Sequence, residues 1–160
     1  MPRKKQIPLG PARRLKPASE RRGEPVMLNG IDHVGIAVED LDAAVELYRR
    51  TLGLEPAHRD VVESQGVEEV LFEVGHSRIQ LVGALGPDTP VGRFLAKRGP
   101  GLHHLGLGVD DVAATLQTLR AAGVPLVDQS PRSGSRGTTV AFVHPAGMGG
   151  VLVELVQEAR

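Results

Sequence analysis

Two histidines and two oxygen-bearing side chains stand at matching places in the two halves of the chain. The segment HVGIAVED begins at His33, and HLGLGVDD begins 71 positions later at His104. Towards the end of each half, the segments RIQLV and LVELV place Gln80 opposite Glu154. Two imidazoles, an amide oxygen and a carboxylate are suitable ligands for one divalent ion such as Co²⁺, Mn²⁺, Ni²⁺, Fe²⁺ or Zn²⁺. Octahedral coordination would leave two positions for substrate oxygens, as a catalytic metal site requires.

All four polar residues need a partner if they are buried. Gln80 and Glu154 each lie between apolar neighbours, whose side chains point to the other face of a strand. Burying such a polar group without a partner costs roughly 1–3 kcal/mol. One shared ion would satisfy both residues together with His33 and His104.

The remaining histidines do not fit the repeat. His103 directly precedes His104, so strand alternation predicts that the two face opposite sides and that only one reaches the ion. Alignment with His33 selects His104. The other histidines have no counterpart in the repeat and are interpreted as surface or loop residues: His58, His76 and His144.

The elements that position these residues also repeat. Each half opens on an alternating strand, which is followed by a helix with an Asp before its first turn and a Gly after its last. Three further strands follow in each half, near 54–62, 67–74 and 78–83, and near 124–127, 138–143 and 150–157. A short helix near 90–98 joins the halves. The sequence predicts an α+β fold, with a domain over 29–160 built from two tandem βαβββ modules, 29–88 and 101–158, that form a shared metal-binding cleft.

Composition narrows the function further. The chain of 160 residues has no Cys, which excludes disulfides, thiolate metal sites and cysteine nucleophiles and is typical of the cytoplasm, where we expect the protein. Residues 1–28 carry eight Lys/Arg against two Glu, and this basic, Pro-containing stretch is predicted to be a disordered extension. The rest of the chain is acidic and poor in aromatic residues, which argues against nucleic-acid binding. No apolar run approaches the roughly 20 residues that span a membrane.

Residues 28–157 resemble the methylmalonyl-CoA epimerases of the glyoxalase-like, or vicinal oxygen chelate, superfamily. The matching segments are DHVGIAVEDLDAAVELYRRTLG, GPDTPVGRFLAKRGPGLHHLGLGVDD and FVHPAGMGGVLVELVQ. The first is common in the superfamily, whereas GLHH and the HP…GGVLVEL ending are more specific. The resemblance implies a metal site at the same four residues, His33, Gln80, His104 and Glu154, for which we expect Co²⁺ first among the divalent ions.

The resemblance also implies a reaction. The proton on C2 of methylmalonyl-CoA would be removed and returned to the opposite face, through an enolate that the metal stabilises. A catalytic glutamate is implied in the strand QGVEEVLFEV, where the motif selects Glu69 over Glu68. The family suggests Glu154 as the second acid–base group, although a metal-bound carboxylate is a weaker base.

The sequence indicates substrate-binding residues less specifically than it indicates metal ligands. The glycine-rich segment SGSRG, residues 133–137, has backbone amides for the substrate carboxylate, with Ser135 or Arg136 assisting, or is a plain turn. Arg93, Lys97 and Arg98 are generic candidates for the phosphates of the acyl-CoA substrate. We expect a homodimer, as is common in this superfamily.

The sequence leaves three alternative functions. Lactoylglutathione lyases of the glyoxalase I type use a similar four-ligand site. An extradiol dioxygenase would hold iron with two His and one carboxylate, and Gln80 argues against it. A metal-free ligand-binding protein of the antibiotic-resistance kind would have no use for paired ligands.

Overall fold

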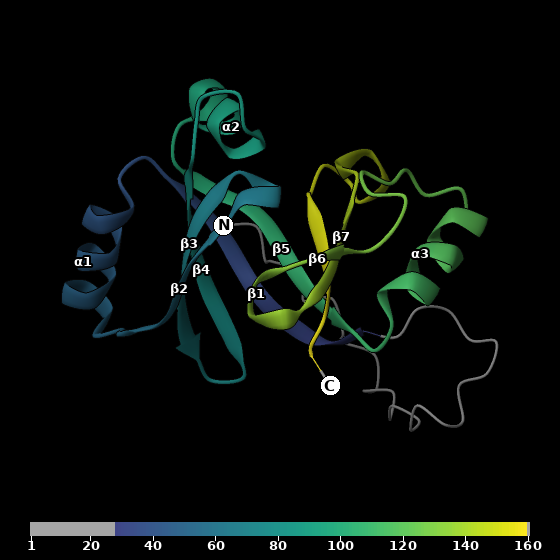
Figure 1. The fold of residues 1–160 in the computed structure, drawn as a ribbon, viewed down its shortest axis with the longest axis horizontal. Helices are drawn as coiled ribbons and strands as arrows, with labels where there is room; N and C mark the ends of the chain where they lie inside the picture. The colour runs from purple at the N-terminus through teal and green to yellow at the C-terminus, as the bar shows by residue number, and fades with distance from the viewer. Residues whose placement is uncertain (1–27, 160) are drawn as a thin grey trace, which may run out of the picture.

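The computed structural model describes residues 28–159, so the predicted basic extension lies outside the described part except for Leu28. Residues 28–159 form eight strands and three helices, with short 3₁₀ turns between some of them (Figure 1). The elements are β1 (Leu28–Val38), α1 (Leu41–Leu52), β2 (Pro56–Val62), β3 (Val67–Val74), β4 (Ser77–Ala84), α2 (Pro90–Arg98), β5 (Gly101–Val109), α3 (Val112–Ala121), β6 (Arg132–Ser133), β7 (Thr139–Val143) and β8 (Val153–Gln157).

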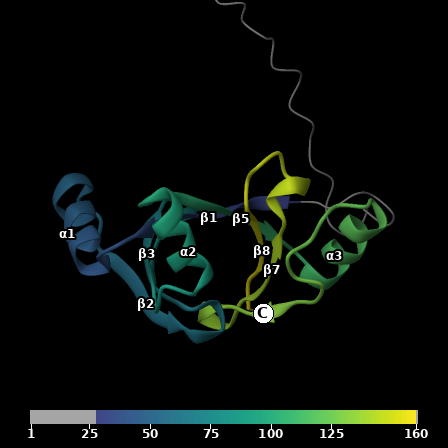
Figure 2. The ribbon, with the colours of Figure 1, turned by 90° about the horizontal axis from the view of Figure 1, so that it is seen from above.

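All eight strands belong to one curled sheet, in the order β2-β3-β4-β1-β5-β8-β7-β6. In each half the opening strand pairs in parallel with the last strand, and the other pairs of that half are antiparallel. The antiparallel pair β1–β5 joins the halves. Figure 2 shows β2 and β3 on one side of this central pair, β7 and β8 on the other, and α1 and α3 at the outer ends. The predicted α+β fold with two βαβββ halves is confirmed.

Local sequence signals explain where α1 and α3 begin. The side chain of Asp40 accepts a hydrogen bond from the Ala43 amide at 2.9 Å, and Asp111 does the same for the Ala114 amide at 2.9 Å. Gly53 ends α1 in the left-handed conformation, with φ of 66°. The two helices therefore begin at equivalent places in the repeat.

Three apolar clusters hold the helices on the sheet. α1 packs on one face of the first half, against Phe72 and Leu81, and α3 packs on the second half, against Leu155. α2 instead covers the opposite face of the first half, where Val91 packs with Val82. Because Val82 and Gln80 point to the same side of β4, α2 lies on the face that carries the polar residues of the repeat.

One predicted strand is absent from the described residues. The segment near 124–127 makes only an isolated bridge, between Leu126 and Val143, and the second strand of the second half is the two-residue β6. Pro125 has no amide hydrogen to donate to a ladder. The amides of Val127 and Asp128 both donate to the Phe142 carbonyl, at 3.0 and 3.1 Å, so the segment bonds to β7 without strand register.

Among residues 28–159, no helix is long and apolar enough to cross a membrane.

Candidate metal and active site

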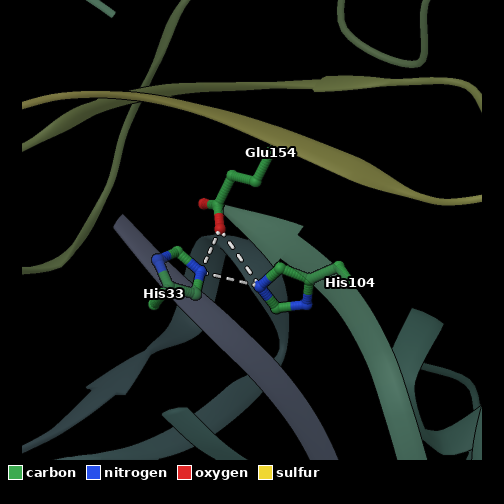
Figure 3. Close-up of side chains that lie close together, drawn as sticks. All are labelled: His33, His104 and Glu154. Atoms are coloured by element: carbon green, nitrogen blue, oxygen red, sulfur yellow. Dashed lines mark hydrogen bonds and ion pairs between the residues drawn. The ribbon is translucent and has the colours of Figure 1, made fainter. Parts of the chain in front are cut away.

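Three buried side chains from three strands converge on the inner face of the sheet (Figure 3). The Nε2 atoms of His33 on β1 and His104 on β5 lie 2.9 Å apart. Oε2 of Glu154 on β8 lies 2.9 Å from the His33 nitrogen and 3.2 Å from the His104 nitrogen. These separations are close to those between neighbouring ligand atoms of a metal whose bonds are about 2.0–2.2 Å long.

The register of the sheet produces this convergence. Gln80 lies beside Gly35 in the pair β1–β4, and Glu154 lies beside Gly106 in the pair β5–β8. These are equivalent positions of the repeat. The sequence pattern therefore placed all four polar residues on one face of the sheet, as the alternation of side chains requires.

Gln80 is the fourth member, and its amide is only half satisfied. The Gln80 Nε2 donates to Glu69 Oε2 at 2.6 Å, whereas Gln80 Oε1 is buried with no hydrogen-bond partner. A buried carbonyl oxygen without a donor is the group that a cation would satisfy. The donor set and this orphaned oxygen fit a divalent metal ion.

Glu69 lines the same small cavity as His33, Gln80 and Glu154. Glu69 is only 2% exposed, and its Oε1 has no hydrogen-bond partner. Glu68 points to the other side of β3, where its carboxylate pairs with the Arg59 Nε at 2.7 Å. The structure thus points Glu69 toward this cavity and Glu68 away from it.

Ser135 and Arg136 line this cavity as well. Arg136 has φ of 56°, a left-handed conformation that a residue other than glycine rarely adopts. Its Nε is buried without a hydrogen-bond partner, and its Nη1 lies 3.5 Å from Glu158 Oε2. The loop therefore places Arg136 at the wall of the cavity, with its guanidinium beside Glu158.

Comparison with known proteins agrees with this geometry. Residues 32–142 match the family model of the glyoxalase/bleomycin resistance protein/dioxygenase superfamily. The ethylmalonyl-CoA/methylmalonyl-CoA epimerase of Cereibacter sphaeroides is 36% identical over 133 residues, which cover 82% of this chain and 99% of that protein. The chain belongs to the methylmalonyl-CoA epimerases of this superfamily.

Solved structures of the family have the same fold. The methylmalonyl-CoA epimerase of Mycobacterium tuberculosis is 41% identical, with a TM-score of 0.81 and coverage of 84% of this chain and 91% of that one. A methylmalonyl-CoA epimerase solved in complex with methylmalonyl-CoA and NH₄⁺ is 44% identical, with a TM-score of 0.81 and coverage of 83% and 96%.

The ionisable groups of the cluster are strongly perturbed. Burial favours the neutral form of Glu154, but hydrogen bonds and charge from His104 and His33 prevail and lower its pKa to about 2. Burial also opposes the charged form of His33, yet Asp32 and Glu154 raise its pKa to about 9. A protonated His33 places a positive charge beside the buried Glu154 carboxylate, and a bound metal cation would do the same.

Each histidine is oriented through its second nitrogen. His33 Nδ1 lies 2.8 Å from Asp32 Oδ1, and Arg78 Nη1 lies 3.1 Å from Asp32 Oδ2. His104 Nδ1 lies 2.9 Å from His103 Nδ1. Burial lowers the pKa of His103 to about 4, with the neighbouring His104 adding to the shift, so His103 is neutral and its Nδ1 can accept a hydrogen bond from His104 Nδ1. With a metal bound, each ligand candidate would keep a proton on Nδ1 and offer Nε2 to the ion.

The prediction that His103 and His104 face opposite sides is wrong. Gly35 pairs with His104 and Ile36 pairs with Leu102, which leaves His103 as the extra residue of a β-bulge. Strict alternation fails at such a bulge, so the adjacent imidazoles come within hydrogen-bonding distance.

His58 is also not a plain surface or loop residue. It lies in β2, and its Nε2 is buried, has no hydrogen-bond partner and lies 4.0 Å from Glu69 Oε1. His76 and His144 are exposed, in agreement with the prediction. Asp32, Arg78 and His58 were missed as residues of the site. The one available signal was that Asp32 directly precedes a repeated histidine.

Proposed function

We propose that this protein epimerises methylmalonyl-CoA at C2, with a divalent metal held by His33, Gln80, His104 and Glu154. The observation that carries the proposal is the single cavity in which buried Glu69 faces the cluster of His33 and Glu154. The orphaned oxygen of Gln80 supports the fourth ligand. We place Co²⁺ first among the divalent ions, and a homodimer remains our expectation.

The substrate needs help to lose its proton, because C2 lies between a thioester and a carboxylate. A bound divalent cation would supply Lewis-acid stabilisation of the negative charge that develops on the substrate oxygens. The chain's own residues must hold the acyl group, exclude water and move the proton.

Glu69 is our candidate base. The Gln80 amide holds one of its oxygens through the 2.6 Å hydrogen bond, which leaves Oε1 to take the C2 proton. As the C2–H bond breaks, its electron pair moves toward the thioester carbonyl, and the proton passes to Oε1. Burial of Glu69 keeps water away from this step.

Glu154 is our candidate for the group on the other face, in addition to its ligand role. The lowered pKa of Glu154 makes it a weak base, and the two histidines occupy its Oε2. The ligand role is therefore better supported than the acid–base role. We assign Ser135 and Arg136 to the substrate carboxylate, which the Arg136 guanidinium would neutralise.

Deuterium incorporation at C2 of methylmalonyl-CoA in D₂O tests the proposal. We expect exchange with Co²⁺-loaded protein, loss of exchange after chelation, and loss in Glu69→Gln. Glu68→Gln is the matched control, because this neighbouring glutamate points away from the cavity and pairs with Arg59. Absence of exchange in metal-loaded wild-type protein would refute the epimerase, and glutathione hemithioacetals would then be the next substrates.

A further inference from the structure

Glu69 is nearly cut off from solvent, and yet it must release the proton that it removes. An epimerase returns a proton to the opposite face of C2, so the proton taken by Glu69 is still on its carboxyl group when the product leaves. Glu69 is 2% exposed, and the Gln80 amide that holds its Oε2 has no basic nitrogen to accept this proton. We propose that His58 carries the proton from Glu69 to solvent, an inference that rests on the proposed function.

Two buried atoms without hydrogen-bond partners lie next to each other at this place. His58 Nε2 lies 4.0 Å from Glu69 Oε1, and neither atom has a hydrogen-bond partner. Leaving such polar groups unpaired costs free energy, and their presence in a folded protein calls for an explanation. Hydrogen bonds between groups that exchange protons are often long in a free enzyme and shorten in the substrate complex. A shift of about 1 Å would bring this pair to hydrogen-bonding distance.

The register of β2 and β3 puts His58 on the inner face of the sheet. Asp60 lies directly opposite Glu69, and His58 lies opposite Leu71, so His58 and Glu69 are diagonal neighbours. Arg59, between His58 and Asp60, points to the outer face and pairs with a carboxylate there. A β-bulge interrupts the register directly before His58. Bulges re-aim side chains, and this one precedes the histidine that approaches Glu69.

His58 also reaches the surface. β2 is an edge strand of the sheet, and the His58 side chain is 31% exposed, against 2% for that of Glu69. One side chain therefore has a buried nitrogen beside Glu69 and a surface open to water. Among residues 28–159, His58 alone brings a Lys, Arg or His nitrogen within 4.0 Å of the Glu69 carboxylate.

His58 acts through Glu69 and not on the substrate. It is absent from the described residues that line the cavity of Glu69. We therefore expect His58 to affect the recovery of the base between turnovers, and not the removal of the C2 proton itself.

The proton moves in two steps. The O–H bond of protonated Glu69 breaks, its electron pair stays on Oε1, and the proton bonds to Nε2 of a neutral His58. The imidazolium then gives a proton to water and is neutral again, so Glu69 begins the next turnover as a carboxylate. Imidazole suits this role because it both accepts and releases protons under physiological conditions. The Asp60 carboxylate, 3.8 Å from Nε2, stabilises the positive charge that His58 carries between the two steps.

Rapid-quench kinetics in D₂O test this relay, with Co²⁺-loaded protein and each C2 epimer of methylmalonyl-CoA in turn. For the epimer that Glu69 deprotonates, the first turnover of His58→Ala should be as fast as that of the wild type. Later turnovers should be about 100-fold slower, the lower end of what a positioned proton-transfer group contributes. Deuterium incorporation at C2 then shows an initial burst equal to the enzyme concentration. The value of kcat falls while kcat/KM is kept, and added imidazole restores kcat.

Two further variants separate proton transfer from a structural role. His58→Gln keeps a hydrogen-bonding amide but cannot carry a proton, so it should show the same burst as His58→Ala. His76→Ala is the matched control, because it removes an exposed histidine from the turn after β3. Its kinetics should match those of the wild type, and circular dichroism verifies that all variants are folded.

The outcomes distinguish this inference from the proposed function. A first turnover slowed as much as the later ones would overturn the relay, because a structural defect slows both. Full steady-state activity in His58→Ala or in His58→Gln would also overturn it. In these cases the wild type is active and the proposed function stands, whereas a wild type that does not epimerise the substrate would overturn both.

Discussion

Gly106 lies directly opposite His33 in the pair β1–β5, and a Cβ atom at Gly106 would lie 2.4 Å from the His33 imidazole. Gly35 has the same relation to His104, at 2.2 Å. Neither glycine has a positive φ, so the requirement is for space and not for an unusual backbone conformation. Each half of the chain thus supplies one histidine and the open surface on which the histidine of the other half lies.

Replacing Gly106 by Ala should therefore displace His33. We expect Co²⁺ affinity to fall by about 10- to 100-fold, as for the loss of a group that orients a ligand. Gly83→Ala is the control, since its Cβ would be 3.6 Å from Leu41, an ordinary contact. Calorimetric titration with Co²⁺ measures the effect, with circular dichroism to verify folding. Equal affinities in the two variants would contradict the role of Gly106.

Removing the charge of Asp32 should weaken the metal site without removing a ligand. Asp32→Asn leaves a poorer acceptor for His33 Nδ1, and we expect about 10- to 100-fold lower Co²⁺ affinity. Glu73→Gln provides the control, because Glu73 also pairs with Arg78 but makes no contact with the ligand histidine. If both variants lose affinity to the same extent, the effect comes from Arg78 and not from the orientation of His33.

Metal affinity should depend on pH through His33. Because Asp32 and Glu154 raise the pKa of His33 to about 9, protons compete with the metal below that pH. Affinity is therefore lowest in acid and rises with pH, by up to about tenfold per unit for one displaced proton, until pH approaches about 9. Chelator competition at pH 6, 7 and 8 measures this slope. A flat profile over this range would show that the metal displaces no proton.

Stability should depend on the cluster beneath α3. Leu116 is 1% exposed and packs with Leu155 and Val143. Leu116→Ala should lower the free energy of unfolding by about 2–5 kcal/mol, because it leaves a cavity. Leu47→Ala, at a position 47% exposed, should cost much less. Urea unfolding of the two variants tests the difference, with the same dependence of the unfolding free energy on urea concentration used for both.

The repeat allowed the inner face of the sheet to be predicted because equivalent residues of two equivalent units occupy equivalent register positions. That symmetry places Gln80 and Glu154 beside Gly35 and Gly106 without knowledge of any long-range contact.

Features that break the regular pattern could not be predicted in this way. The bulge at His103 suspends alternation, and Pro125 removes a donor from an otherwise strand-like segment. The pairing of Arg78 with Asp32 joins residues 46 positions apart, with no periodicity to mark it. Strand patterns predict which face a residue occupies, but they do not predict its partner on that face.

The two halves are not exact copies at the site, since one contributes Gln80 where the other contributes Glu154. A symmetric pair of first halves would hold an ion with no carboxylate, and a symmetric pair of second halves would hold it with two. The mixed set carries one negative charge, so a bound dication would retain a net charge of about +1. The difference between the halves at this one position thus leaves a centre that still attracts an anionic ligand.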